Sequence, residues 1–306
     1  MAATSESYRD FVSRHPGTTI DRRGLSLHYV DEGSGSPVVM IHGDPTWSIL
    51  YRHLIDALNG SHRVIVPDHI GCGLSEKPDE SSYAYTLASR VDDLEFLLDS
   101  LGLDSELTLV LHDWGGAIGM GYAARHPDRV ARLVICNTAA FHKPAAKSFP
   151  MALAICRVRP LGAFLVRGLN AFARGAAWIG CKRRPMCRDL RAAYIAPYDS
   201  WNNRVAILRF VEDIPLFPSD AGYGLVSWVE ERLPALARVP MLVLWGMKDF
   251  VYDRHCLDEW LRRFPEAEVI RFNEAGHNLF EDEPEAITLA VQSFLKKPHL
   301  VREPVG

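Results

Sequence analysis

The segment 107–124 constrains the fold of this chain more than any other, because it changes abruptly from a strand pattern to a helical one. An apolar run at 107–111 stops at the sequence HDWGG (112–116), and small residues at helical spacing follow. The pattern predicts a buried strand, a tight turn and a helix, with Asp113 at the apex of the turn. In such a turn the apical side chain is exposed at the carboxyl edge of a sheet, and the glycines let the helix approach the strand.

The aspartate at this apex indicates a nucleophile that forms an alkyl ester. A serine in this place attacks acyl carbons, whereas the usual covalent role of a carboxylate is attack on a saturated carbon. The backbone N–H of the next residue, Trp114, can stabilise an oxyanion, and its indole N–H can hold a departing anion. A helix-capping aspartate followed by a core tryptophan would produce the same local pattern, because aspartate is a common helix N-cap.

Length and composition favour one large domain or a domain with an insertion. The chain has 306 residues, of which 48% are hydrophobic, and a formal net charge of −4. No uncharged apolar run reaches the roughly 18 residues of a membrane span, and the first residues lack a signal region, so we expect a cytoplasmic protein. The six cysteines form no CxxC pair and indicate neither disulfides nor a zinc site. The mild acidity argues against nucleic acid as a partner.

Strand and helix patterns alternate along most of the chain, which predicts an α/β fold. A hairpin is expected at 19–33 and a terminal helix at 284–295. Such alternation predicts a mostly parallel sheet with helices on both faces. The predicted central strands cover 37–41, 64–68, 107–111, 130–135, 240–246 and 268–272.

Between 141 and 228 the strand patterns vanish and arginine-rich helical segments replace them. We interpret this segment as a helical cap inserted between a first core part, 1–140, and a second core part, 229–306. A solvated helix face accounts for its basic charge. The alternative is a docking surface for an acidic partner, another enzyme, a second copy of the chain or a membrane surface.

Two further side chains complete a catalytic set with Asp113. Asp249 and His277 each fall just after a predicted strand, at the edge where ligand sites in α/β sheets are built. The order nucleophile, acid, histidine is that of α/β-hydrolases. Asp249 would orient His277, which would activate the water that attacks the ester of Asp113. Asp253 is the alternative acid, but Asp249 is closer to the strand end.

These motifs resemble those of the haloalkane dehalogenase family of α/β-hydrolases over nearly the whole chain. The resemblance implies an enzyme that cleaves a carbon–halogen bond to give an alcohol and a halide, without metal or organic cofactor. Epoxide hydrolases share the HDWGG motif and use cap tyrosines, for which Tyr194 and Tyr198 are candidates, so epoxide hydrolysis is a weaker alternative. The similar stretches are HGDPTWS (42–48), DHIGCGLSEKP (68–78), LHDWGG (111–116), CNTAAF (136–141), WGMKDF (245–250) and AGH (275–277).

Two stretches of the predicted cap resemble one branch of that family more specifically. LVRGLNAFARGAAWIGCKRRPM (165–186) and APYDSWNNRVAILRFVEDIPL (196–216) are similar to the branch that includes the β-lactone decarboxylases of bacterial olefin biosynthesis. The resemblance implies, as an alternative to dehalogenation, that a cis-3-alkyl-4-alkyloxetan-2-one ring is opened and loses carbon dioxide to give an alkene. Both reactions call for a small hydrophobic substrate.

One position departs from the family pattern. Where Asp44 stands, family members often carry an asparagine whose amide helps the tryptophan after the nucleophile to hold halide. The backbone N–H of Asp44 remains a second oxyanion donor, but its carboxylate would repel a developing anion. Some members with an acid there use a second tryptophan from the cap, for which Trp178 and Trp201 are the candidates. Asn137 stands where other members place the triad acid, which favours Asp249 in that role.

Overall fold

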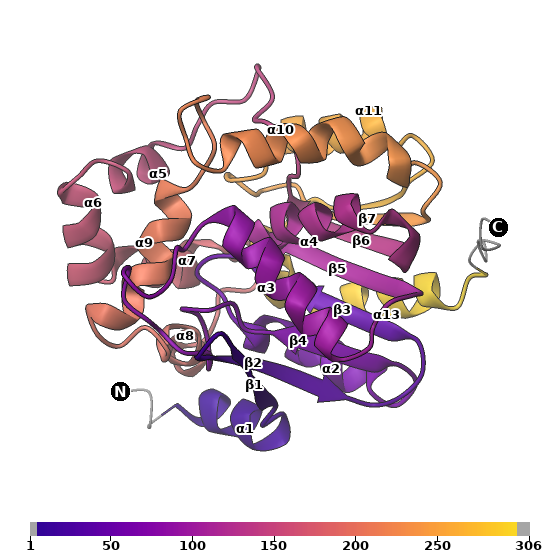
Figure 1. The fold of residues 1–306 in the computed structure, drawn as a ribbon, viewed down its shortest axis with the longest axis horizontal. Helices are drawn as coiled ribbons and strands as arrows, with labels where there is room; N and C mark the ends of the chain where they lie inside the picture. Colours follow the sequence, from indigo (N-terminus) through magenta and orange to yellow (C-terminus); the bar gives the residue numbers. More distant parts are fainter. Residues whose placement is uncertain (1–4, 299–306) are drawn as a thin grey trace.

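The apolar strand runs form a central eight-stranded sheet in the computed structural model, which describes residues 5–298 (Figure 1). The strands follow the order β1-β2-β4-β3-β5-β6-β7-β8. The pairs β1–β2 and β2–β4 are antiparallel, whereas β3, β4, β5, β6, β7 and β8 pair in parallel. Their bounds are β1 (Thr18–Arg22), β2 (Leu25–Glu32), β3 (Pro37–Ile41), β4 (Arg63–Pro67), β5 (Leu107–Asp113), β6 (Val130–Thr138), β7 (Met241–Gly246) and β8 (Glu268–Phe272).

The central strand β5 is buried along its whole length. It lies between β3 and β6, with Val110 opposite Met40 on one side and Val134 on the other. A strand covered on both faces reads as a continuous apolar run, which is why this segment stands out in the sequence. Because β3, β5, β6, β7 and β8 are parallel, the loops after them meet at one edge of the sheet.

Helices cover both faces of the sheet (Figure 1). One face packs against α3, α4, α10 and α11 and the other mainly against α1, α2, α12 and α13, in two separate apolar clusters. The predicted mostly parallel sheet with helices on both faces is therefore confirmed. The bounds are α1 (Glu6–Arg14), α2 (Arg52–Leu58), α3 (Leu87–Ser100), α4 (Trp114–Arg125), α10 (Tyr223–Arg232), α11 (Arg254–Arg263), α12 (Leu279–Asp282) and α13 (Pro284–Leu295).

A group of short helices between β6 and α10 forms the cap over the carboxyl edge of the sheet (Figure 1). The cap predicted at 141–228 ends within α10, whose Val226 and Val229 join the core cluster and which packs against α4. No helix in the described part of the chain has the length and apolar character needed to cross a membrane. The cap helices are α5 (Met151–Cys156), α6 (Leu161–Ala163), η4 (Phe164–Gly168), α7 (Ala171–Ile179), α8 (Arg188–Ile195) and α9 (Val205–Glu212).

Candidate active site

The turn between β5 and α4 holds Asp113 in a strained backbone conformation at the edge of the sheet. Its φ is 52° and its ψ is −127°, a region that residues with a side chain rarely adopt. Close approach of the flanking segments enforces this turn, because a Cβ on Gly115 would lie 1.9 Å from the Ile41 carbonyl oxygen. Although Asp113 occupies the N-cap position of α4, its side chain accepts no capping hydrogen bond. The carboxylate is therefore directed to the site and does not serve as a helix cap.

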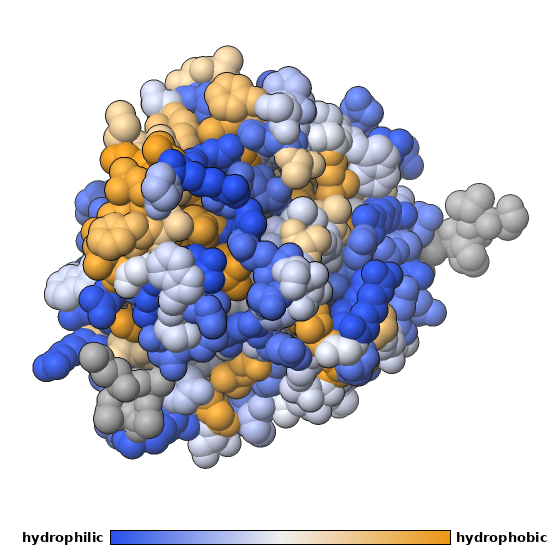
Figure 2. Space-filling view, turned by 60° about the vertical axis from the view of Figure 1, so that its left-hand side comes forward, coloured by the Kyte–Doolittle hydropathy of each residue, from blue (hydrophilic) through white to orange (hydrophobic). Residues whose placement is uncertain are grey.

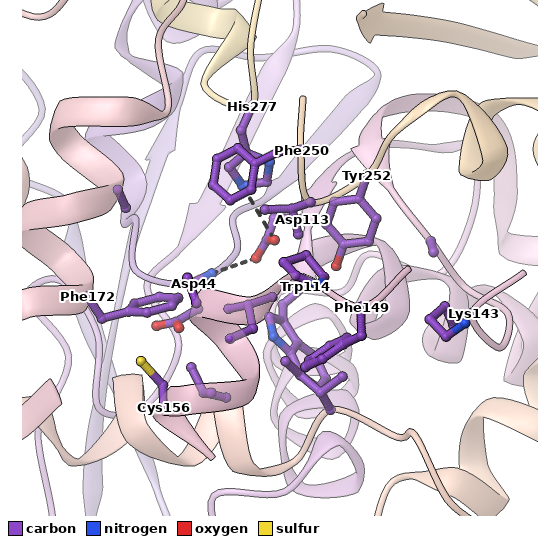
Figure 3. A pocket seen from close by; sticks show the side chains of 18 of the residues that line it. Asp44, Asp113, Trp114, Lys143, Phe149, Cys156, Phe172, Phe250, Tyr252 and His277 are labelled. Carbon is purple, nitrogen blue, oxygen red and sulfur yellow. Dashed lines mark hydrogen bonds and ion pairs between the residues drawn. The ribbon is translucent and has the colours of Figure 1, made fainter. Parts of the chain in front are cut away.

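Asp113, His277 and Asp249 converge from three strand ends. Figure 3 marks the ion pair between the first two as a dashed line. His277 Nδ1 lies 2.9 Å from Asp249 Oδ2, and its Nε2 lies 3.5 Å from Asp113 Oδ2. All three side chains are buried. This arrangement has the geometry of a nucleophile and a histidine base that is oriented by an acid.

Asp249 is fixed by one donor from β6 and one from its own loop. The Asn137 side-chain amide donates to Asp249 Oδ2 over 2.9 Å, and the Val251 backbone N–H donates to Oδ1 over 2.7 Å. The alternative acid, Asp253, lies elsewhere, since it caps α11 through the His255 N–H and pairs with Lys147 at 3.1 Å. The structure thus places Asp249 at His277 and gives Asp253 a different set of partners.

Two backbone N–H groups point at the nucleophile. The N–H of Asp44 donates to Asp113 Oδ1 over 2.8 Å (Figure 3). The N–H of Trp114 also donates to this carboxylate. Gly43 is needed for this approach, because a Cβ there would lie 2.1 Å from Asp113 Oδ1. When Asp113 is esterified, its carbonyl oxygen stays against the same donors, which suit the oxyanion formed as water attacks.

The charges of the triad favour a protonated histidine in the free enzyme. Burial lowers the pKa of His277, but the charge and hydrogen bond of Asp249 and the charge of Asp113 outweigh it and raise the pKa to about 9. Burial raises the pKa of Asp113, opposed by the His277 charge and the two N–H donors. An ester on Asp113 would remove the negative charge of this residue, which is one of the causes that raise the pKa of His277. His277 would then be a better base towards a water molecule.

The side chain of Asp44 differs from the triad because it lacks partners. Both of its carboxyl oxygens are buried without a hydrogen bond in the described structure, and the group points into the cavity towards Phe172 and Cys156 (Figure 3). Burial, followed by the negative charge of Asp113, raises the pKa of Asp44 well above its usual range. These effects favour the neutral acid, which can donate a hydrogen bond where a carboxylate would repel an anion.

A cavity of about 430 Å³ lies between the sheet edge and the cap. Asp44, Asp113, Trp114 and His277 reach it from the sheet side, and the cap side is mainly apolar. The Trp114 indole N–H makes no hydrogen bond to another residue of the described range and is available to a ligand. Apolar side chains on the wall include Phe149, Leu153, Leu165, Phe172, Val211 and Ile214.

The fold and this site agree with known protein families. The model of the α/β-hydrolase fold family matches residues 36–284, most of the chain. The chain belongs to this family. A solved α/β-hydrolase, the haloalkane dehalogenase DatA of Agrobacterium tumefaciens, superposes with a TM-score of 0.81 at 27% identity and covers 91% of this chain and 95% of its own.

Proteins similar to this α/β-hydrolase include β-lactone decarboxylases and haloalkane dehalogenases. A cis-3-alkyl-4-alkyloxetan-2-one decarboxylase of Shewanella oneidensis is 54% identical over 90% of this chain and 87% of that protein. A cis-3-alkyl-4-alkyloxetan-2-one decarboxylase of Xanthomonas campestris is 46% identical over 90% of this chain and 94% of that protein. Haloalkane dehalogenase 2 of Mycobacterium tuberculosis is 33% identical over 87% of this chain and 90% of that protein. The expected resemblance to the dehalogenases and to the β-lactone decarboxylase branch is confirmed, and the α/β-hydrolase is an enzyme.

The structure does not place the predicted cap tryptophans in the cavity of the hydrolase. Trp178 is 64% exposed and lies under the Arg191 guanidinium, 3.7 Å from the ring centroid, and it does not line the cavity. Trp201 is 47% exposed and contacts Arg167. The expectation that Trp178 assists Trp114 is therefore corrected: the helix presents this side chain to the outer surface of the cap.

The two cap tyrosines do not line the cavity either. The Tyr194 hydroxyl donates to Glu281, and the Tyr198 hydroxyl donates to the Thr46 carbonyl oxygen over 3.0 Å. Both hydroxyls are thus occupied in holding the cap to the core. They give the epoxide-hydrolase alternative no ring-activating group.

Two residues of the hydrolase site escaped the sequence reasoning. Tyr252 is packed on His277, with ring centroids 6.0 Å apart and an angle of 19° between the rings, and it lines the cavity. Burial and the charges of Asp113 and Asp249 raise the pKa of its hydroxyl well above its usual range, so it stays neutral. His112 donates from Nε2 to the His277 carbonyl oxygen over 2.9 Å. For His112 the adjacent Asp113 was the available signal, whereas no local pattern indicates that Tyr252 packs on His277.

Proposed function

We propose that this enzyme is a β-lactone decarboxylase that converts cis-3-alkyl-4-alkyloxetan-2-ones to alkenes and carbon dioxide. The observation that carries the proposal is the identity to decarboxylases, 54% and 46%, against 33% for a haloalkane dehalogenase over similar lengths. The decarboxylase alternative therefore fits better than the carbon–halogen hydrolysis that the sequence motifs first favour. Asp44, Trp114 and the triad supply the groups that the reaction needs.

In the proposed first step, Asp113 attacks C4 of the ring, the saturated carbon that bears both an alkyl group and the ring oxygen. The carbon–oxygen bond breaks, and the ring oxygen leaves as a carboxylate that stays tethered to the alkyl ester of Asp113. The Trp114 indole and the neutral Asp44 carboxyl group can donate hydrogen bonds to this carboxylate. The imidazolium of His277 adds a positive charge beside the reacting carboxyl groups.

In the proposed second step, the tethered carboxylate leaves as carbon dioxide. The electrons of the broken carbon–carbon bond form the alkene, and the ester oxygen departs as the Asp113 carboxylate. No water or proton is consumed, so the nucleophile is regenerated without hydrolysis. Inversion in the first step followed by anti elimination in the second converts a cis-lactone into a cis-alkene.

Carbon–halogen hydrolysis is the second candidate, because the triad and the two oxyanion donors also suit the hydrolysis of an alkyl ester. A free halide, however, would have only one indole donor, since neither Trp178 nor Trp201 lines the cavity. The Asp44 side chain would have to serve as the second donor in its protonated form. We expect slow halide release compared with lactone turnover.

Product analysis tests the proposal. Purified enzyme receives a long-chain cis-β-lactone in one reaction and a 1-bromoalkane in a parallel one, both in heavy-oxygen water. The expected result is a cis-alkene from the lactone, no heavy oxygen in Asp113 by peptide mass analysis, and little bromide. A β-hydroxy acid as the main product would contradict the proposal, because it would show hydrolysis of the lactone. Rapid bromide release with intact lactone would establish the dehalogenase instead.

A further inference from the structure

One face of the cap carries large apolar side chains in contact with solvent. They lie on α5, α6, η4 and α7 and on the turn after α5, and these elements pack against one another in the order α5, α6, η4, α7. Figure 2, which turns the cap side forward, shows hydrophobic side chains gathered on this part of the surface. We call this surface the cap face; its main residues are Met151, Ile155, Val158, Leu161, Phe164 and Trp178, exposed by 40 to 74%.

The cavity opens at the cap face. Ile155 of α5 and Ile179 of α7 line the cavity and are also 40% and 47% exposed. The exposed positions Ala152 and Ala171 of the same two helices line it as well. The apolar surface outside and the apolar wall inside are therefore continuous through this opening.

The cap is also strongly basic. Residues 141–228 contain thirteen lysine and arginine residues against five aspartate and glutamate residues, although the whole chain has a net charge of −4. On α7, Arg174 is exposed one turn before Trp178, and its side chain has no acidic partner among residues 5–298. Further cap cations without an ion pair in the described range are Lys143, Arg167, Lys182, Arg188 and Arg191.

We infer that the cap face docks on the surface of an anionic lipid membrane. Apolar side chains would enter the headgroup region while the surrounding cations meet the lipid phosphates. A protein seated on this face would cover the opening of the cavity, whereas a bilayer leaves the opening in contact with acyl chains. An apolar ligand could then pass between membrane and cavity without crossing water.

Vesicle flotation tests the inference on the full chain. We expect the enzyme to float with mixed phosphatidylglycerol and phosphatidylcholine vesicles at low salt, to be released by high salt, and to bind pure phosphatidylcholine weakly. Arg174→Glu and Phe164→Ser should each reduce the bound fraction about tenfold, through lost charge attraction and lost apolar burial. Neither residue lines the cavity, so turnover of a short, water-soluble substrate should be retained.

Two matched variants control for general effects. Leu289 is 66% exposed on α13, away from the cap, and Arg238 is exposed just before β7, at the opposite edge of the sheet from the cavity. Leu289→Ser and Arg238→Glu should leave vesicle binding unchanged. The inference is overturned if the wild-type chain stays unbound, if neutral and anionic vesicles bind it equally, or if the controls lose binding equally. Self-association by light scattering that the cap-face variants abolish, without vesicle binding, would instead assign this face to a second copy.

Discussion

The two sides of the cavity are built differently. At the sheet edge, Asp113 and Asp249 each accept hydrogen bonds from strand ends or the loops after them, and Asp249 in turn holds His277. On the cap side, short helices contribute mainly apolar side chains, such as Phe172 and Leu165, and no member of the triad. Under the proposed function, bonds would be made by groups that the sheet holds in place, and the cap would select the substrate.

Asp44 is the exception on the sheet side. Its backbone N–H contacts the nucleophile, yet its side-chain oxygens have no partner within residues 5–298. A buried polar group without a partner costs free energy, which a function can justify. Substitutions in the triad, at Asp44 and in the cap should therefore affect turnover to different degrees.

The largest loss is expected from Asp113→Asn. The amide cannot form the alkyl ester, so alkene and bromide formation should both fall by about 10⁴-fold or more. Initial rates of product formation measure this, with Asp258→Asn as a control because Asp258 is an exposed aspartate on α11. Activity within tenfold of wild type would mean that Asp113 is not the nucleophile.

A somewhat smaller loss is expected from Asp249→Asn. His277 would lose its orientation and charge partner, and the rate of ester hydrolysis with a bromoalkane should fall by about 10³-fold. Asp253→Asn alters the other acid of this loop and should retain most activity. Equal losses in both variants would contradict the assignment of Asp249.

Asp249→Asn should also change how the stability of the protein depends on pH. A histidine whose folded pKa is raised stabilises the fold fully below its unfolded value of 6.5, and this contribution is lost as the pH rises through about 9. Melting temperatures should therefore fall less steeply over this window in Asp249→Asn than in wild type. Parallel curves would show that Asp249 does not support the protonated His277.

Asp44→Asn should have a moderate effect. The asparagine amide keeps a hydrogen-bond donor, so lactone turnover should change by about tenfold or less, while bromide release should rise. Because burial raises the pKa of Asp44, the wild-type chain should lose stability as the pH rises from the usual carboxyl range towards that higher pKa. The variant should then be more stable than wild type at alkaline pH by about 1–3 kcal/mol, measured by denaturant unfolding.

The expected increase in bromide release by Asp44→Asn depends on the hydrogen-bond donor that the asparagine keeps at this position. Asp44→Ala removes the donor and should lower both reactions. If Asn and Ala behave alike, the side chain at this position does not hold the leaving group.

The sequence predicted the sheet edge well because its features are local. A continuous apolar strand, a turn rich in glycine and a polar residue directly after a strand end can all be read from neighbouring positions. Asp113 is the last residue of such a strand, Asp249 and His277 follow two others within a few residues, and parallel pairing brings the strand ends together. Tyr252 was missed because nothing in its local pattern shows that its ring packs on His277.

The cap was harder to predict because the direction of a helix face depends on distant packing. The pattern of α10 is helical, but only its packing shows that Val226 both lines the cavity and joins the core cluster with Val229. The protonation of Asp44 likewise depends on burial that the sequence does not display. Trp178 was expected at the cavity because some related dehalogenases use a second tryptophan from the cap, and no local pattern distinguishes it from Trp201.

The smallest effect is expected from Trp178→Ala. The indole lies on the outside of α7 against Arg191 and does not reach the cavity, so lactone turnover and bromide release should each stay within about twofold of wild type. Trp114→Phe, which removes an indole donor that does line the cavity, should lower both by about 10²-fold. A loss in Trp178→Ala that matches the loss in Trp114→Phe would mean that α7 turns this side chain inward when substrate binds. The cap would then contribute a side chain that takes part in the reaction, in addition to those of the sheet edge.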